Sequence, residues 1–202
     1  MRASVWSASG LPALSFGFRF CCLLAWQIIV TGTPAAAQTP PIRSLEYKVK
    51  AAYLFNFAKY TEWPERAFSS REAPIVIGIL GSDPFGDLLE STISDRRVGT
   101  RNVVVKRSRR VEDFGQAHVV FVSASEKERL PAILAALKGT NALTVSEIQQ
   151  FCDNGGMIAF LIEKDVVRFD VNLDNTEQAG LKISARMLSS ARTVLGKRNQ
   201  SK

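Results

Sequence analysis

The most constraining stretch of this 202-residue sequence is AAYLFNFAKYTEWP, residues 51–64, which predicts a helix with apolar side chains on almost every side. A surface helix of a small soluble domain normally carries one continuous polar face. Between Leu45 and Tyr60 the charged residues are instead scattered around the helix: Glu46, Lys48, Lys50 and Lys59. The helix therefore needs a sheet on one side and, on the other, a neighbouring helix, a second subunit or a partner protein.

The N-terminal segment has the features of a cleaved export signal. Arg2 and Arg19 precede the apolar run FCCLLAWQIIV, residues 20–30, and a small-residue site follows at residues 35–37. The run is too short to span a bilayer comfortably, although an uncleaved N-terminal anchor is the alternative. We therefore expect a periplasmic protein with a signal peptide (1–37), an extended leader (38–44), one α/β domain (45–195) and a basic tail (196–202).

Charge and cysteine content narrow the function classes. Loss of the two signal arginines would lower the formal net charge from +7 to +5, but export argues against nucleic acid as the partner. Cys152 is the one cysteine left after residue 37, so no intramolecular disulfide is expected. We interpret Cys152 as a small buried apolar residue. An intermolecular disulfide or a redox-sensitive thiol is the alternative.

The order of apolar runs predicts an α/β fold. Short runs rich in Val, Ile and Phe indicate strands at residues 75–80, 102–107, 118–123 and 142–146, and a hairpin at residues 157–172. Helices are expected at residues 45–60, from Pro84, over residues 123–139, after Ser146 and from Ile183 to Leu195. This order predicts a single compact domain with a mostly parallel sheet, an antiparallel hairpin at its edge and flanking helices.

The sequence offers little for catalysis. Residues 81–86, GSDPFG, lack the full glycine-rich fingerprint of a dinucleotide site. His118 is the only histidine and opens a buried run, so we interpret it as packed or hydrogen-bonded. Cys152 could pair with it as a nucleophile, but no third orienting group stands at a recognisable spacing. We predict no catalytic residue, no metal site and no cofactor, and an unrecognised enzyme remains a weaker hypothesis.

Basic residues concentrate in one stretch of the chain. They could form a solvated strand edge, or a surface that docks electrostatically to something acidic. The stretch contains Arg96, Arg97, Arg101, Lys106, Arg107, Arg109 and Arg110.

Two blocks of the sequence resemble the YfiR family of exported bacterial proteins. The first is EYKVKAAYLFNFAKYTEWP, residues 46–64, and the second comprises GGMIAF, VRFDVNL and AGLKISARML within residues 155–188. The resemblance covers residues 46–194. It implies a compact α/β sandwich without enzymatic activity that represses a membrane-bound diguanylate cyclase through the sensor domain of the cyclase. It also implies a homodimer and sequestration by an outer-membrane lipoprotein with a peptidoglycan-binding domain.

One departure from the family pattern bears on regulation. Relatives often carry a cysteine just before the strand HVVFV, where this chain has Ala117. Redox gating through an internal disulfide is therefore not expected here.

We predict interaction residues on the opening helix and on the strand that contains Arg168. Arg168 and Asp170 alternate with apolar residues and should face away from the core, and Asn172 should tie down nearby backbone. A soluble solute-binding or transport accessory module is the alternative function. The candidate partner-binding residues are Lys50, Tyr53, Phe57, Lys59, Trp63 and Arg168.

Overall fold

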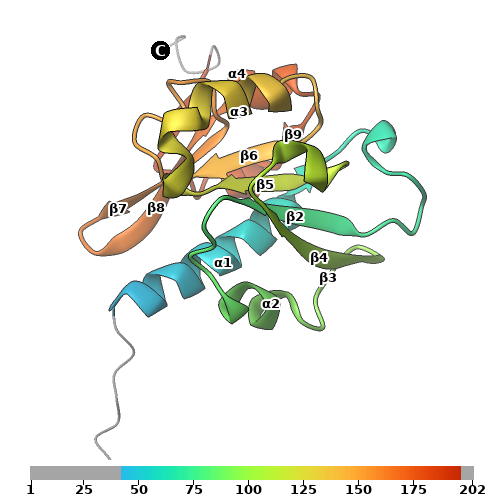
Figure 1. The fold of residues 1–202 in the computed structure, drawn as a ribbon, viewed down its shortest axis with the longest axis horizontal. Helices are drawn as coiled ribbons and strands as arrows, with labels where there is room; N and C mark the ends of the chain where they lie inside the picture. Colours follow the sequence, from blue (N-terminus) through green and yellow to red (C-terminus); the bar gives the residue numbers. More distant parts are fainter. Residues whose placement is uncertain (1–41, 197–202) are drawn as a thin grey trace, which may run out of the picture. The chain divides into compact units, whose positions relative to one another are not determined.

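The computed structural model describes residues 42–196, which fold around one eight-stranded mixed sheet (Figure 1). The predicted signal peptide, residues 38–41 of the leader and residues 197–202 of the tail lie outside the described residues. The strand order is β10-β8-β7-β6-β5-β2-β4-β3, and a separate pair is formed by β1 and β9. The predicted fold, α/β with a mostly parallel sheet and an antiparallel hairpin, is confirmed.

The elements alternate along the chain much as the apolar runs predicted. The strands are β1 Thr61–Glu62, β2 Ile75–Leu80, β3 Arg97–Val98, β4 Arg101–Ser108, β5 Val119–Val122, β6 Leu143–Ser146, β7 Ile158–Glu163, β8 Val166–Asn172, β9 Lys182–Ile183 and β10 Thr193–Leu195. The helices are α1 Ile42–Tyr60, α2 Asp87–Ile93, α3 Leu130–Leu137, α4 Leu173–Gln178 and α5 Ala185–Leu188, with 3-10 turns η1 Glu65–Ala67, η2 Val111–Phe114 and η3 Ala124–Arg129.

Strand direction changes at the hairpin. Strands β4, β2, β5, β6 and β7 run parallel, and β8 returns antiparallel to β7. Lys164 and Asp165 form the turn with φ angles of 51° and 61°. Such a pair of left-handed residues matches the twist of the two strands. The hairpin is not the sheet edge, however, because β10 pairs in parallel with β8 beyond it.

The sheet has a core on each face because its central strands are apolar on both sides. On one face, residues such as Ile77, Phe121 and Phe169 pack against α1 and α2. On the other face, Leu80, Val120 and their neighbours pack against α3 and the turns η2 and η3. Figure 1 shows α1 and α2 on one side of the sheet and α3 on the other. This double coverage explains why the strands are continuous apolar runs.

Helix α1 begins at Ile42, before the predicted start at Leu45, so residues 42–44 are not an extended leader. Its inner side, which includes Ala51, Leu54 and Ala58, is fully buried against the sheet. Helices α2 and α5 pack beside it. These two helices therefore cover part of the apolar surface of α1 that does not face the sheet.

The prediction of a long last helix from Ile183 to Leu195 is wrong. Helix α5 ends at Leu188, and Thr193–Leu195 join the sheet as β10. Without β10, the outer edge of β8 would present unpaired backbone groups. The Arg192 backbone N–H, just before β10, donates to the Phe169 carbonyl of β8 at 2.8 Å. The Arg192 side chain also pairs with Asp170, which anchors the strand. Pairing with an open edge overrides the helical spacing of the apolar residues.

The local structure around three expected helices differs from the sequence prediction. Residues 147–155 form turns rather than a helix, and Ser146 Oγ accepts from the Ile148 backbone N–H at 3.0 Å. Helix α2 starts at Asp87 rather than at Pro84, and Asp83 accepts a hydrogen bond from the Phe85 backbone N–H in the preceding turn. The helix expected over residues 123–139 is divided into η3 and α3. The Ser123 side chain accepts the capping bond from the Ser125 backbone N–H, and the Ser125 hydroxyl accepts from the Ser82 backbone N–H.

Candidate partner-binding surface

The predicted interaction residues are not gathered in one patch. Lys50 and Phe57 are buried, with exposed fractions of 3% and 1%. Tyr53 and Trp63 are half-buried, and Lys59 and Arg168 are exposed. Lys50 lies near the middle of α1, whereas Trp63 follows the helix, which ends at Tyr60. Arg168 lies on the face of β8 opposite the apolar core. Lys50 and Phe57 are buried in the monomer, and partner binding by all six residues stays a prediction.

Lys50 is buried because two carboxylates compensate its charge. Its Nζ pairs with Glu46 one turn earlier and lies 2.5 Å from Glu147 Oε2, just after β6. The Tyr47 hydroxyl donates to Glu147 at 3.1 Å, so the cluster links α1 to the carboxyl end of β6. Burial alone lowers the pKa of Lys50, but the hydrogen bonds to Glu147 and Glu46 outweigh it, and the pKa is raised.

Aromatic rings fix the middle of α1 to the hairpin. Tyr53 lies 5.3 Å from the Phe169 ring, and Phe57 lies 5.6 Å from the Phe160 ring and 5.0 Å from Phe169. Such contacts add to the stabilisation from apolar burial. The rings fasten α1 rigidly to the β7–β8 hairpin, and they leave only part of Tyr53 at the surface.

Exposed apolar side chains occur near the start of α1 and on both faces of the hairpin beside its turn. We define the hairpin end as Leu45, Val49, Ile162 and Val166, which are 57%, 37%, 49% and 48% exposed and are the large exposed hydrophobic residues among those described. Figure 1 places the start of α1 and the tip of β7–β8 at the same end of the molecule. Clustered exposed apolar residues are more typical of an interaction surface than scattered ones.

A cleft of about 650 Å³ opens beside the hairpin end. Glu46, Lys50 and Glu147 line one part of it, and Ile162 and Arg192 line others. Lys50 and its two carboxylate partners are therefore part of the cleft wall, although the Lys50 side chain is only 3% exposed. Sequence reasoning found Lys50 but missed Glu147, which is distant in the chain, and the hairpin residues, whose alternation gave no sign of their position beside α1.

The opposite end of α1 is closed by packing around His118. Its ring stacks on Phe68 at 4.5 Å and meets Trp63 edge-on at 5.6 Å. The Val76 backbone N–H donates to His118 Nδ1 at 3.1 Å, so the proton belongs on Nε2, which is buried near the Ala67 backbone without a hydrogen bond of normal geometry. Burial, with the nearby charge of Arg101, lowers the pKa of His118 to about 4. His118 is packed and hydrogen-bonded, as predicted.

Cys152 is buried and free, which confirms its interpretation as a small apolar residue. Burial, with the charge of Asp170, raises the pKa of the thiol to about 12. The thiolate is the reactive form of cysteine, so this environment disfavours redox chemistry at Cys152.

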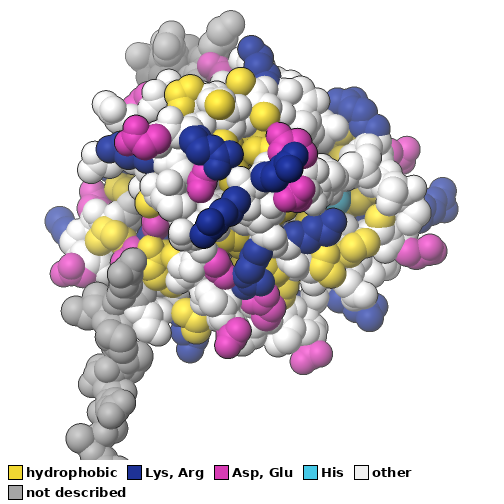
Figure 2. Space-filling model, viewed as in Figure 1, with side chains coloured by type: hydrophobic (Ala, Val, Ile, Leu, Met, Phe, Trp, Pro, Cys, Tyr) yellow, Lys and Arg dark blue, Asp and Glu magenta, His cyan; other side chains and the backbone are white. Residues whose placement is uncertain are grey.

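The basic stretch is partly neutralised. Arg107 pairs with Asp83 and Glu90, and Arg101 donates to the Ser70 and Ala73 carbonyls and stacks on Phe68 at 3.7 Å. Figure 2 shows basic and acidic side chains interleaved on the viewed face. This favours a solvated strand edge over one dedicated acidic-partner surface.

The family comparison gives the decisive observation. A family model described as YfiR/HmsC-like matches residues 47–192. The chain belongs to the YfiR/HmsC-like family. The YfiR/HmsC-like family is a periplasmic, regulatory family. No curated protein matches the sequence.

Solved structures share the fold of this YfiR/HmsC-like chain at low identity. One is a conserved domain protein from Vibrio cholerae O1 biovar El Tor, with 9% identity, a TM-score of 0.50 and 71% of this chain covered. Another is described as the ABC domain in complex with L-Trp from Streptococcus pneumonia, with 10% identity, a TM-score of 0.51 and 72% covered. This chain spans 60% of the length of each. At such identity the likeness concerns the fold alone.

The blocks that resemble the YfiR family have clear structural roles. A Cβ on Gly156 would lie 2.2 Å from the Phe151 ring, so only glycine fits there. Asn172 accepts from the Asn175 backbone N–H at 3.1 Å, which caps α4, and donates to the Cys152 carbonyl at 3.1 Å. Asn172 therefore ties down backbone, as predicted. These residues hold in place the start of β7 and the carboxyl end of β8, away from the hairpin turn.

Two observations concern spanning helices and metals. Among residues 42–196, no helix combines the length and apolar character needed to cross a membrane. In the same residues, no group of three or more His, Cys, Asp and Glu side chains is placed to hold a metal ion.

Proposed function

We propose that this protein is a non-enzymatic periplasmic regulator that binds the periplasmic part of a membrane sensor and represses a diguanylate cyclase. The single observation that carries the proposal is the family match over residues 47–192. Repression would follow if the protein bound the inactive state of the sensor more tightly than the active one. An outer-membrane peptidoglycan-binding lipoprotein that sequesters it, and a homodimeric state, are further parts of the proposal.

The hairpin end is the surface that we propose for the sensor. Leu45 and Val49 project from α1, and Ile162 projects from the face of the hairpin that packs against α1, so two elements present apolar groups together. Val166, which pairs with Glu163, projects from the other face of the hairpin. The aromatic contacts of Tyr53 and Phe57 hold these elements in a fixed relation. A rigid apolar surface loses little conformational entropy when it binds.

The first test is crosslinking of the tagged protein in its native envelope, followed by mass spectrometry. We expect a membrane protein with a cyclase domain to be recovered, with crosslinks at the hairpin end. Deletion of the gene should raise cellular cyclic-di-GMP. Recovery of the protein alone, with unchanged cyclic-di-GMP, would contradict the proposal.

Point variants then locate the surface. Leu45→Glu and Ile162→Glu should reduce crosslinking to the sensor at least about tenfold, since each buries a charge in an apolar contact. The matched control is Ala132→Glu, which adds the same charge at an exposed position of α3 on the other side of the sheet. If all three variants bind equally well, the sensor contacts another surface.

A further inference from the structure

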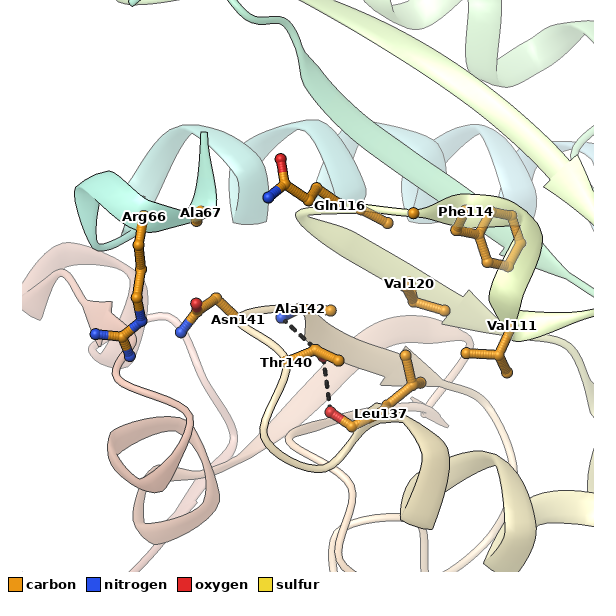
Figure 3. Close-up of a pocket in the computed structure, with 12 residues that line it drawn as sticks. Arg66, Ala67, Val111, Phe114, Gln116, Val120, Leu137, Thr140, Asn141 and Ala142 are labelled. Atoms are coloured by element: carbon orange, nitrogen blue, oxygen red, sulfur yellow. Dashed lines mark hydrogen bonds between the residues drawn. The ribbon is translucent and has the colours of Figure 1, made fainter. Parts of the chain in front are cut away.

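A separate cavity of about 250 Å³ lies at the amino ends of β5 and β6, remote from the hairpin end. Arg66 of η1 borders it on one side and Val111 and Phe114 of η2 on another. The segment from Leu137 to Ala142, after α3, completes the wall (Figure 3). Three segments that are distant in the sequence therefore meet around one small space.

The cavity has an apolar part and a polar part. Figure 3 shows the side chains of Phe114, Val111, Val120 and Leu137 grouped on one side, and Arg66 and Asn141 together on the other. Phe114 is 2% exposed and Val120 is fully buried, so the apolar wall belongs to the core behind the sheet. A concave space that combines an apolar wall with a few convergent polar groups is the usual form of a ligand site.

Two of the four polar side chains that line the cavity, those of Thr140 and Asn141, already have partners. The Thr140 hydroxyl donates to the Leu137 carbonyl at 2.7 Å and accepts from the Ala142 backbone N–H at 3.4 Å. The Asn141 amide group donates to the Ala179 carbonyl at 2.7 Å. The side chains of Arg66 and Gln116, by contrast, make no hydrogen bond or ion pair with any of residues 42–196.

The charge of Arg66 is not balanced within the cavity. None of the lining residues carries a carboxylate. An arginine guanidinium presents a planar fork of donors that matches a carboxylate with two parallel hydrogen bonds. The absence of a lining carboxylate also means that nothing in the cavity wall would pair with an ammonium group.

We propose that this cavity binds a small monocarboxylate with a compact apolar body. The carboxylate pairs with Arg66 and the body lies against Phe114, Val111 and Leu137. Because the wall offers no counter-charge to an ammonium, a simple carboxylate binds better than the corresponding amino acid. The site is independent of the sensor-binding proposal, because its test uses the purified protein alone.

The test is a thermal shift of the exported protein with three related probes at millimolar concentration. Phenylacetate should raise Tm, because a compound that binds only the folded state stabilises it. Phenylacetamide, which lacks the charge, and phenylalanine, which adds an ammonium, should give at most about half of that shift. No shift with phenylacetate, or an equal shift with phenylacetamide, would overturn the proposal. An equal shift with phenylalanine would overturn the preference for a simple carboxylate.

Variants connect the shift to Arg66. Arg66→Gln should weaken phenylacetate binding at least about tenfold by titration calorimetry, and Arg66→Lys should retain part of it. Arg66 is exposed, so both variants should melt like the parent protein without ligand. Arg71→Gln removes an exposed arginine that does not line the cavity and should bind normally. Binding that survives Arg66→Gln would overturn the assignment.

Discussion

Lys50 and His118 are both buried titratable side chains, but their pKa values are shifted in opposite directions. Lys50 has Glu46 and Glu147 beside it and keeps its charge, and its pKa is raised. His118 has aromatic rings and the Arg101 charge around it, and its pKa is lowered to about 4. Burial disfavours the charged form at both sites, so the difference lies in the counter-charges.

The largest expected effect comes from removal of the buried cation. Lys50→Met leaves Glu46 and Glu147 close together without compensation, and we expect a loss of about 3 kcal/mol in the free energy of unfolding. Urea denaturation measures it. The double variant with Glu147→Gln should recover at least about 1 kcal/mol, because it removes one of the two unpaired charges. A single variant as stable as the parent would mean that the cluster is more solvated than its burial indicates.

The second prediction concerns pH. Below the ordinary histidine value of 6.5 the unfolded chain takes up a proton, whereas folded His118 remains neutral down to about pH 4. The unfolded state therefore binds more protons in this window, and stability falls as pH falls from 6.5 to 4, by up to about 3 kcal/mol. Lys50 affects stability in the alkaline range. Its contribution to the free energy of unfolding is complete below pH 10.5 and is lost as pH rises through the raised pKa of Lys50.

His118→Asn isolates the acid limb of that pH dependence. The asparagine carbonyl oxygen can replace Nδ1 as acceptor for the Val76 backbone N–H, but it does not titrate. Urea midpoints of the parent and the variant, compared between pH 4 and 7, should show a flatter profile for the variant. An unchanged slope would assign the acid limb to other groups.

The smallest effect on stability is expected at Arg107, a more exposed cation that also lies between two carboxylates. Arg107 also bridges two carboxylates, Asp83 and Glu90, but its side chain is 37% exposed compared with 3% for Lys50. Arg107→Met should cost less than about 1 kcal/mol, and the cost should shrink further at high salt. A cost equal to that of Lys50→Met would show that burial is not what separates the two clusters.

Much of the fold was predictable because local patterns carry it. The β-branched runs at Ile75–Leu80 and Val119–Val122 became central strands, and Lys164–Asp165 became the hairpin turn. The candidate surface was less predictable. Lys50 was expected to bind a partner, and its burial depends on Glu147, 97 residues later in the chain. A sequence pattern does not reveal a compensating charge at that distance.

The sequence by itself determined the strand and helix order, the buried states of Cys152 and His118, and the family, since these depend on local composition and spacing. The tertiary structure decided which apolar residues remain exposed. Leu45 and Ile162 look like core residues in the sequence, but Leu45 lies in the first turn of α1 and Ile162 next to the hairpin turn, and both side chains remain exposed. It also decided that Thr193–Leu195 form a strand, because the open edge of β8 offered hydrogen bonds that a helix could not use.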